Sequence, residues 1–196
     1  MKRLPVGQPF YNPAFKTSTA CLKHALDTGG MYAQLDFRTE PFGGRSTFSE
    51  SFHPTYTEKL EVMSGQGCCV LNGKMTKIKA GDVIEFLPCA THIHPWSESD
   101  EELHIIQTTS SPVPDADGID TQMHIIAILA YLARHEQTDS GSIPGIFQIA
   151  LMMDMLMPNT YVKGMPPFMQ QVFFRSIAGL GKLLGYKAWP ADDLLA

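Results

Sequence analysis

The sequence predicts a mainly β domain of the sandwich or barrel type, followed by an α-helical extension. Residues 30–110 consist of short segments of alternating polarity separated by turn residues, which is the pattern of half-buried strands. Residues 120–196 carry long apolar runs with few charges, and these favour helices. The segment 111–119 between them is rich in Pro and Asp and is predicted to be a linker. Residues 1–29 are expected to add an N-terminal arm or strand across a barrel edge.

Within the first region, alternation and turn residues locate the individual strands. The predicted strands cover residues 31–38, 47–53, 58–63, 68–71, 75–78, 83–87 and 103–108. Alternation places Ser51 and His53 on one face of their strand, and Glu58 and Leu60 on one face of the next. The Asn72-Gly73 pair indicates a tight hairpin, because both central residues of that turn take positive φ. Several short strands joined by turns imply a sandwich or barrel.

The extension is predicted to contain three helices, over residues 123–134, 146–157 and 168–184. Pro158 ends the second helix, and Pro166-Pro167 is a favourable start for the third. Seven of the 11 methionines lie beyond residue 120, which suits irregular packing or an adaptable apolar surface. We expect the extension, residues 120–196, to pack on the barrel or on a partner subunit.

Length and charge restrict the classes of function. The 196 residues fit one domain of ordinary size, or one domain with an appendage. A net charge of -5 and the lack of any Lys- or Arg-rich run predict no nucleic-acid partner. No apolar run reaches the roughly 18 to 20 residues of a membrane span, and Pro5, Gly7 and Pro9 interrupt any secretory signal. The four cysteines follow no paired spacing, so we expect reduced thiols and a cytoplasmic location.

Three residues point to a metal site. His53 lies at the end of one predicted strand, Glu58 at the start of the next, and His92 on another strand after the turn at Pro88. A closed barrel can bring these side chains together around one cavity. Two histidines and one carboxylate suit divalent iron, manganese, nickel or zinc, and they leave coordination positions open for a substrate or dioxygen.

Two stretches carry a resemblance to the cupin superfamily. His53-Pro-Thr-Tyr-Thr-Glu58, with Gly65 beyond it, resembles the first cupin motif, and Gly81-Asp82 leading through Pro88 to His92 resembles the second. The resemblance covers about residues 30–110 and implies a small single-barrel cupin, which is a double-stranded β-helix or jelly roll. It matches His53 to the second His of the first motif, Glu58 to its Glu and His92 to the His of the second motif. It also implies a homodimer.

The chain departs from the cupin pattern at two places. Ser51 stands where the first motif has its first His, and Cys89 and Ala90 follow Pro88 where a Gly is usual. The four-ligand site of many cupins is therefore incomplete, and a three-ligand site remains. The alternative is a barrel that keeps the fold without metal or activity.

A binding pocket is predicted beside the metal ligands. His94 and Trp96 alternate with His92, so they are expected to face the same cavity. His94 is then a substitute ligand or an acid/base group and Trp96 an aromatic wall; alternatively, both are rim residues. Ser51, together with Thr47 and Ser49, makes the predicted face polar, which favours a small polar molecule over a lipid.

Two functions fit these patterns. The first is a metal-dependent enzyme on a small polar molecule, of the dioxygenase, isomerase or decarboxylase type found among cupins with related sites. The second is a non-catalytic protein that binds or senses a small molecule without a functional metal. The retained histidines and glutamate favour the first, whereas Ser51 in place of a ligand favours the second.

Overall fold

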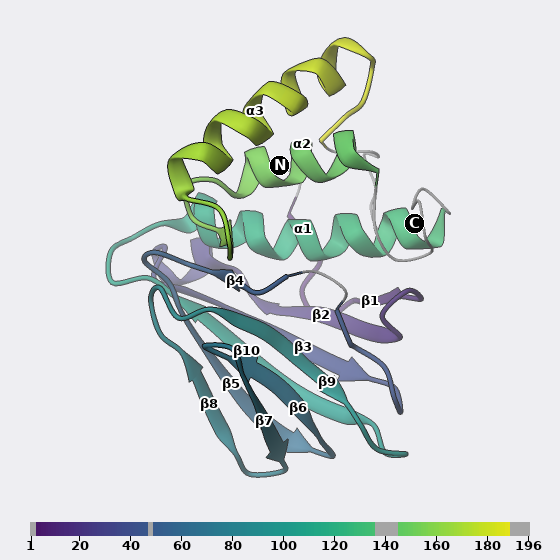
Figure 1. Ribbon diagram of the computed structural model, residues 1–196. Coiled ribbons are helices and arrows are strands. Elements are labelled where there is room, and N and C mark those ends of the chain that lie inside the picture. The colour runs from purple at the N-terminus through teal and green to yellow at the C-terminus, as the bar shows by residue number, and fades with distance from the viewer. Residues whose placement is uncertain (1–2, 47–48, 136–144, 189–196) are drawn as a thin grey trace.

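The computed structural model describes residues 3–46, 49–135 and 145–188, and it contains two antiparallel sheets followed by three α-helices (Figure 1). The strands are β1 (Pro9–Asn12), β2 (Thr17–Lys23), β3 (Tyr32–Thr39), β4 (Ser51–Phe52), β5 (Thr57–Ser64), β6 (Gln66–Leu71), β7 (Lys74–Lys79), β8 (Val83–Phe86), β9 (His92–Ser97), β10 (Leu103–Ser110) and β11 (Tyr161–Val162). One sheet has the order β1-β2-β3-β10-β5-β8 and the other the order β11-β4-β9-β6-β7. The predicted class, a mainly β double-stranded β-helix with a helical extension, is confirmed.

The local signals for strands and turns agree with the structure. β6 and β7 pair up to Leu71 and Lys74, and the two residues between them, Asn72 and Gly73, have φ values of 51° and 77°. Both are in the left-handed region that a tight hairpin requires. Before the barrel, β1 and β2 extend the larger sheet beyond β3, and a short 3-10 helix, Ala25–Thr28, follows β2.

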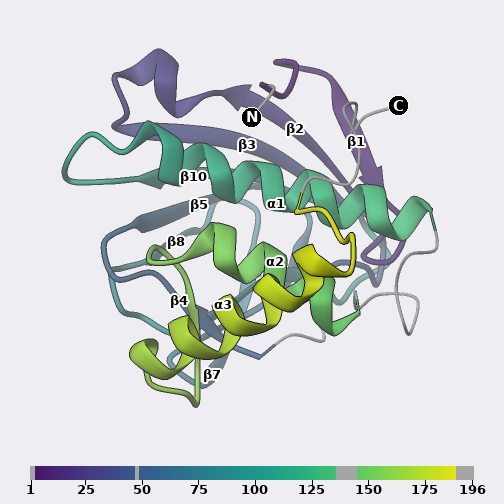
Figure 2. The same cartoon turned by 90° about the horizontal axis from the view of Figure 1, so that it is seen from above.

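The helices are α1 (Ala116–Arg134), α2 (Ile146–Leu156) and α3 (Pro167–Leu183). α1 begins inside the segment 111–119 that was expected to be a linker, because Asp115 caps it by accepting a hydrogen bond from the Gly118 N–H at 3.0 Å. α1 lies across one end of the barrel, α2 lies on α1, and α3 is the outermost layer (Figures 1 and 2). Among the described residues, no helix has the length and hydropathy of a membrane span.

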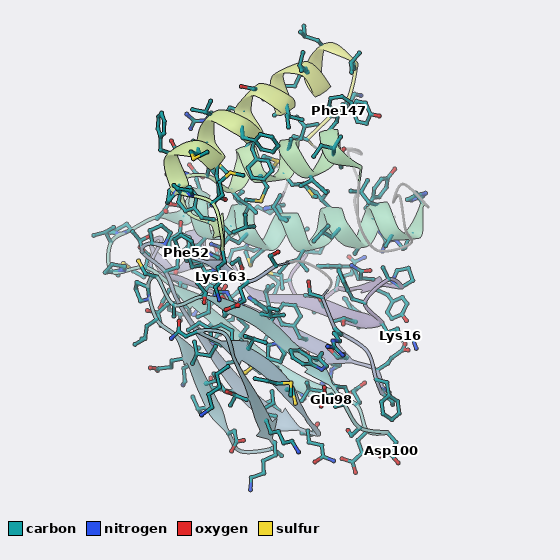
Figure 3. All side chains as sticks on the ribbon, in the orientation of Figure 1. Lys16, Phe52, Glu98, Asp100, Phe147 and Lys163 are labelled. Atoms are coloured by element: carbon teal, nitrogen blue, oxygen red, sulfur yellow. The ribbon has the colours of Figure 1, made fainter. Side chains whose placement is uncertain are left out.

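Two joints connect the helical layers to the barrel. At the first, the hydroxyl of Tyr56 donates to the carboxylate of Asp115, and the Asn159 side chain donates to the same oxygen at 3.3 Å. At the second, Lys163 bonds Glu50 at 2.6 Å. Figure 3 shows Phe52 and Lys163 where barrel and helices meet, and Glu98 and Asp100 at the opposite end of the barrel. One end of the barrel is therefore covered by helices.

Candidate metal centre

The buried positions of the central strands change from apolar to polar towards the helices. Along the strands these positions are Leu103, Ile105, Gln107 and Thr109 on β10, and Val62, Leu60 and Glu58 on β5. The polar ends lie side by side, because Thr109 pairs with Glu58. A buried carboxylate is costly unless partners surround it, so the helix-covered end must supply those partners.

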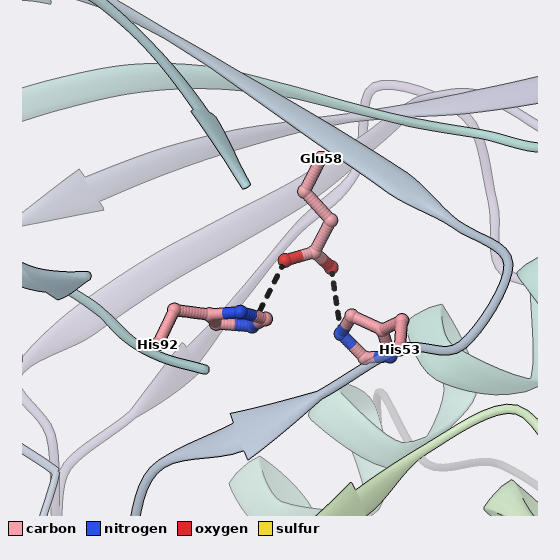
Figure 4. Close-up of side chains that lie close together, drawn as sticks. All are labelled: His53, Glu58 and His92. Carbon is pink, nitrogen blue, oxygen red and sulfur yellow. Dashed lines mark ion pairs between the residues drawn. The ribbon is translucent and has the colours of Figure 1, made fainter. Parts of the chain in front are cut away.

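Two histidines meet Glu58 at this end (Figure 4). His53 directly follows β4, and His92 is the first residue of β9, next to β4 in the same sheet. Their Nε2 atoms lie 3.5 Å and 3.3 Å from the two different oxygens of the Glu58 carboxylate. The side chains are 8%, 2% and 1% exposed for His53, Glu58 and His92. The barrel thus brings the three predicted ligands together in a site shielded from solvent.

Hydrogen bonds on the far side of each ring fix how the two imidazoles are presented. Nδ1 of His53 lies 3.1 Å from the carbonyl oxygen of Asn159 and 3.0 Å from the hydroxyl of Thr160. Nδ1 of His92 lies 3.0 Å from the carbonyl oxygen of Ala90. A carbonyl oxygen only accepts, so Nδ1 carries a proton in both rings, and in the neutral form of each ring the Nε2 turned towards Glu58 is unprotonated. Metal-ligating histidines are oriented by the same kind of backbone contact.

The two Nε2 atoms and the Glu58 carboxylate are hydrogen-bond acceptors with no donor between them, and such an arrangement suits a cation. The Nε2–carboxylate separations exceed the roughly 2.7–2.9 Å of a charge-assisted hydrogen bond, and Nε2 of His92 is buried without a hydrogen-bond partner. One ligand atom each from His53, Glu58 and His92 lies within 4.8 Å of the others. The set can therefore hold a divalent metal, and imidazole with carboxylate suits iron, manganese, nickel or zinc.

The protonation states agree with this arrangement. Burial lowers the pKa of His92 to about 4, against the opposing pull of Glu58, so the ring is neutral near pH 7. Burial alone would raise the pKa of Glu58, but His94 and then His53 outweigh it and hold that pKa below its usual range. Burial opposes protonation of His94, yet the nearby Glu58 charge and their hydrogen bond raise the His94 pKa. Glu58 is thus an ionised carboxylate supported by His94.

His94 faces the predicted cavity but lies beside the metal-ligand set. Its Nε2 is 3.0 Å from Oε2 of Glu58, and its side chain is 40% exposed. Among the described residues, the group that can hold a metal contains His53, Glu58 and His92 and does not contain His94. His94 is therefore placed to hold the Glu58 carboxylate and to contact a molecule in the cavity, because it also lines that cavity.

The prediction that Trp96 faces the same cavity is wrong, because β9 contains a bulge. Pairing between β6 and β9 slips between Cys68 and Val70, so the alternation that began at His92 is shifted at Trp96. Trp96 pairs with Cys68, and both side chains contact Glu98: the indole N–H donates at 2.9 Å and the thiol at 3.2 Å. Trp96 therefore lies on the outer face of the barrel.

Ser51 lines the cavity in the position that the cupin motif gives to a histidine. It pairs with His92 between β4 and β9, and Ser49 also lines the cavity. Thr47, predicted on the same face, lies outside the described residues. At the second departure, Cys89 takes a φ of 66°, the left-handed region that a glycine favours. The turn before His92 thus keeps the conformation without the glycine.

A cavity of about 320 Å³ adjoins the three ligands, and its walls come from both the barrel and the helices. The residues that line it are Leu35, Ser46, Ser49, Ser51, His53, Glu58, His92, Ile93, His94, Gln107, Thr109, Gln122, Met123, Ile125, Ile126, Leu129, Ile149, Met152, Met153, Leu156, Thr160, Val162 and Phe174. Most of the helical contribution is apolar, contrary to the polar pocket expected from the barrel strands alone. Its volume is in the range of small-molecule sites.

Three polar residues at the site were not singled out from sequence. Gln107 donates to Glu58 at 3.1 Å, the Gln122 amide lies 3.4 Å from Nδ1 of His53, and Thr160 bonds the same ring. Gln107 interrupts the apolar positions of its predicted strand, and that polar residue at an inward position was a usable signal. Gln122 and Thr160 gave none, because they lie 69 and 107 residues from His53 in the chain.

A barrel of two antiparallel sheets with a His, Glu, His set at one end is a double-stranded β-helix with a possible metal site. No protein-family model and no curated protein sequence matches the chain.

Solved structures of the double-stranded β-helix class do match. A predicted oxalate decarboxylase from Thermotoga maritima is 16% identical over 56% of this chain and 99% of its own, with a TM-score of 0.46. A Klebsiella pneumoniae protein with a double-stranded β-helix domain is 17% identical over 58% and 85% (TM-score 0.41). The match to a proposed sugar phosphate isomerase from Acidithiobacillus ferrooxidans, 20% identical, covers 50% of this chain and 62% of that one (TM-score 0.40). These likenesses concern the fold.

Proposed function

We propose that the protein is a metal-dependent enzyme that binds a small molecule in the cavity beside His53, Glu58 and His92. The observation that carries the proposal is the meeting of two imidazole Nε2 atoms and the Glu58 carboxylate in a buried site, with Nε2 of His92 left without a hydrogen-bond partner. A bound metal would act as a Lewis acid on a substrate oxygen or would activate dioxygen. The reaction is of the isomerase, decarboxylase or dioxygenase type.

The protein's own residues have distinct roles in this proposal. His53 and His92 hold their Nε2 atoms in place through Asn159 and Ala90. His94 is a positioning residue, because its Nε2 lies 3.0 Å from Oε2 of Glu58, the carboxylate oxygen that also faces His92. The apolar residues of α1 and α2 exclude water from the reacting end, which strengthens electrostatic interactions there.

The second candidate is a non-catalytic binding or sensing protein, and one observation favours it. His53 is bonded by Thr160 and lies against Gln122, both from the helical extension, so occupancy of the site would be felt directly by the helices. Turnover of a substrate distinguishes the two candidates.

The expected homodimer remains a prediction, to be measured by light scattering during size-exclusion chromatography.

The metal content of purified protein tests the proposal. After reconstitution with Fe(II), Mn(II), Ni(II) or Zn(II) in turn, we expect about one equivalent of metal in the wild type, and a loss of 100-fold or more in affinity in His53→Ala and His92→Ala. His104→Ala is the matched control, because His104 lies away from the site, where its Nε2 is 3.3 Å from the carboxylate of Asp36. Unchanged metal content in both site variants, or none in the wild type, would refute the proposal.

A further inference from the structure

A second cavity continues the first one away from the metal ligands. It measures about 210 Å³ and shares Ser46, His94, Gln107, Ile126 and Leu129 with the cavity beside the metal set. Its other walls are largely barrel residues such as Phe15, Phe37 and Ile105. A molecule that begins at the metal ligands can therefore extend past His94 into this space.

α1 presents one stripe of side chains along both cavities. Gln122, Ile126 and Leu129 are spaced by four and three residues, which places them on the same face of the helix. Gln122 lies at the His53 end, and Ile126 and Leu129 line both cavities. Both apolar side chains are only half-buried, whereas Ala127 and Ile128 beside them are fully buried. The stripe changes from polar to apolar with distance from the metal set.

The polar groups around the metal set are neutral hydroxyls and amides apart from Glu58 and the imidazoles. They come from Ser49, Ser51, Gln107, Thr109, Gln122 and Thr160. Neither lining contains a Lys or Arg among the described residues. With no Lys or Arg, and with His94 facing Glu58 at 3.0 Å, the metal-free cavity offers no unpaired cation to a carboxylate or phosphate, and Glu58 repels such groups.

We infer that the site takes an amphipathic molecule, with a hydroxyl-bearing head at the His53, Glu58, His92 set and an apolar body along Ile126 and Leu129 into the second cavity. This inference rests on the proposed function for the identity of the site and adds the class of substrate. The helices supply most of the apolar wall of the first cavity, because the barrel strands present a largely polar wall there. A small polar molecule would leave Met152, Met153 and their neighbours facing water.

Binding of straight-chain alcohols to the chelator-treated protein tests the inference independently of metal. From 1-hexanol to 1-decanol, we expect Kd to fall about fourfold per added methylene, the value for burying one CH₂, until the cavities are full. Calorimetric titration or the shift in melting temperature gives Kd. Fatty acids of equal length should bind more weakly at pH 8. Affinity that does not depend on chain length, or glycerol and glucose that bind better than 1-octanol, would overturn the inference.

Substitutions in the apolar stripe locate the bound chain. Leu129→Asn should weaken 1-octanol binding about tenfold, since a buried Leu contact is worth roughly 1.5 kcal/mol or more, and Ile126→Thr gives a milder change that preserves folding. Leu180→Asn on α3 is the matched control, because Leu180 is 56% exposed and outside both cavities. Equal alcohol binding in all three variants would refute the placement of the apolar chain along Ile126 and Leu129. Metal binding without any chain-length dependence of alcohol affinity would refute this inference alone, whereas chain-length dependence in a protein that binds no metal would refute the proposed function alone.

Discussion

The two ends of the barrel interior are built from the same strands and differ in how they are filled. The end away from the helices is packed by six buried residues, Leu60, Val62, Cys69, Ile78, Leu103 and Ile105, whereas Phe86 of the same cluster stacks on His92 at the other end. The end under the helices holds the ionised Glu58, its histidines and a cavity of about 320 Å³. On each strand the two ends meet between successive inward-facing residues, Leu60 and Glu58 on β5 and Ile105 and Gln107 on β10.

This difference separates stability from function within one barrel. Burial of apolar surface contributes most of the folding free energy, and inside the barrel the packed end supplies that burial. The hollow end places a carboxylate and an unpaired Nε2 in a buried position, an arrangement that costs free energy unless a ligand compensates it. Residues at the packed end should therefore govern unfolding, and those at the hollow end should govern binding.

The largest expected effect is at the packed end. Leu103 is 1% exposed, so Leu103→Ala should lower the free energy of unfolding by about 2–5 kcal/mol through lost contacts and a new cavity. Leu129→Ala, at the wall of an existing cavity, should cost less than half as much because that site is already open. Urea denaturation followed by circular dichroism measures both. Equal losses in the two variants would contradict the division between the ends.

Metal should stabilise the protein only through the hollow end. At a free concentration 100 times Kd, a metal that binds the folded state adds about 2.7 kcal/mol to the free energy of unfolding. We expect this gain in the wild type and in His104→Ala and its loss in His92→Ala, because His92 supplies a ligand atom of the set. Thermal denaturation with and without added metal shows the difference. A stabilisation that persists in His92→Ala would place the metal elsewhere.

The joint that holds the helices over the hollow end should give an effect of similar size. Asp115→Ala removes the N-cap of α1, worth about 1 kcal/mol, and leaves the hydroxyl of the 1% exposed Tyr56 unpaired, worth about 1–3 kcal/mol more. The combined loss should be about 2–4 kcal/mol. When Asp115→Ala is made in a protein that already carries Tyr56→Phe, no hydroxyl is left unpaired and the contribution of Tyr56 to the loss disappears. The double-mutant cycle should therefore give a coupling free energy between Tyr56 and Asp115 of about 1 kcal/mol or more. Additive losses would show that the hydrogen bond between Tyr56 and Asp115 contributes nothing to the free energy of unfolding.

The sequence predicted the parts of this comparison that depend on local pattern. Alternation predicted the strands and one shared end for His53, Glu58 and His92, and the three side chains meet at that end. Trp96 was misplaced because a bulge, which alternation does not reveal, shifts β9 by one residue.

The apolar wall of the cavity could not be predicted, because it depends on where the helices pack. Ile126 and Leu129 have the same residue types as core positions of α1, and only tertiary structure shows that they face a cavity. The polar face of the strands therefore suggested a polar ligand, whereas the whole cavity is mostly apolar. Sequence pattern locates the ligand atoms of such a site better than it describes the pocket around them.

The smallest expected effect concerns the second joint and its dependence on pH. The hydrogen bond from Lys163, followed by that from Thr91, lowers the pKa of Glu50 below its ordinary value. Since the folded pKa is below the unfolded one, the ionised joint stabilises the protein above the unfolded pKa of about 4.3, and the gain is lost as the pH falls through the folded pKa.

Glu50→Gln removes that charge, so the wild type should melt at a higher temperature than the variant at pH 7, and the gap should close as the pH approaches 3. Glu85→Gln serves as the control, because Glu85 is exposed on β8, away from the joint. A gap between wild type and Glu50→Gln that stays constant from pH 7 to pH 3 would show that the charge of Glu50 does not hold the helical layers to the barrel. The first joint, which contains Tyr56 and Asp115, would then carry that connection.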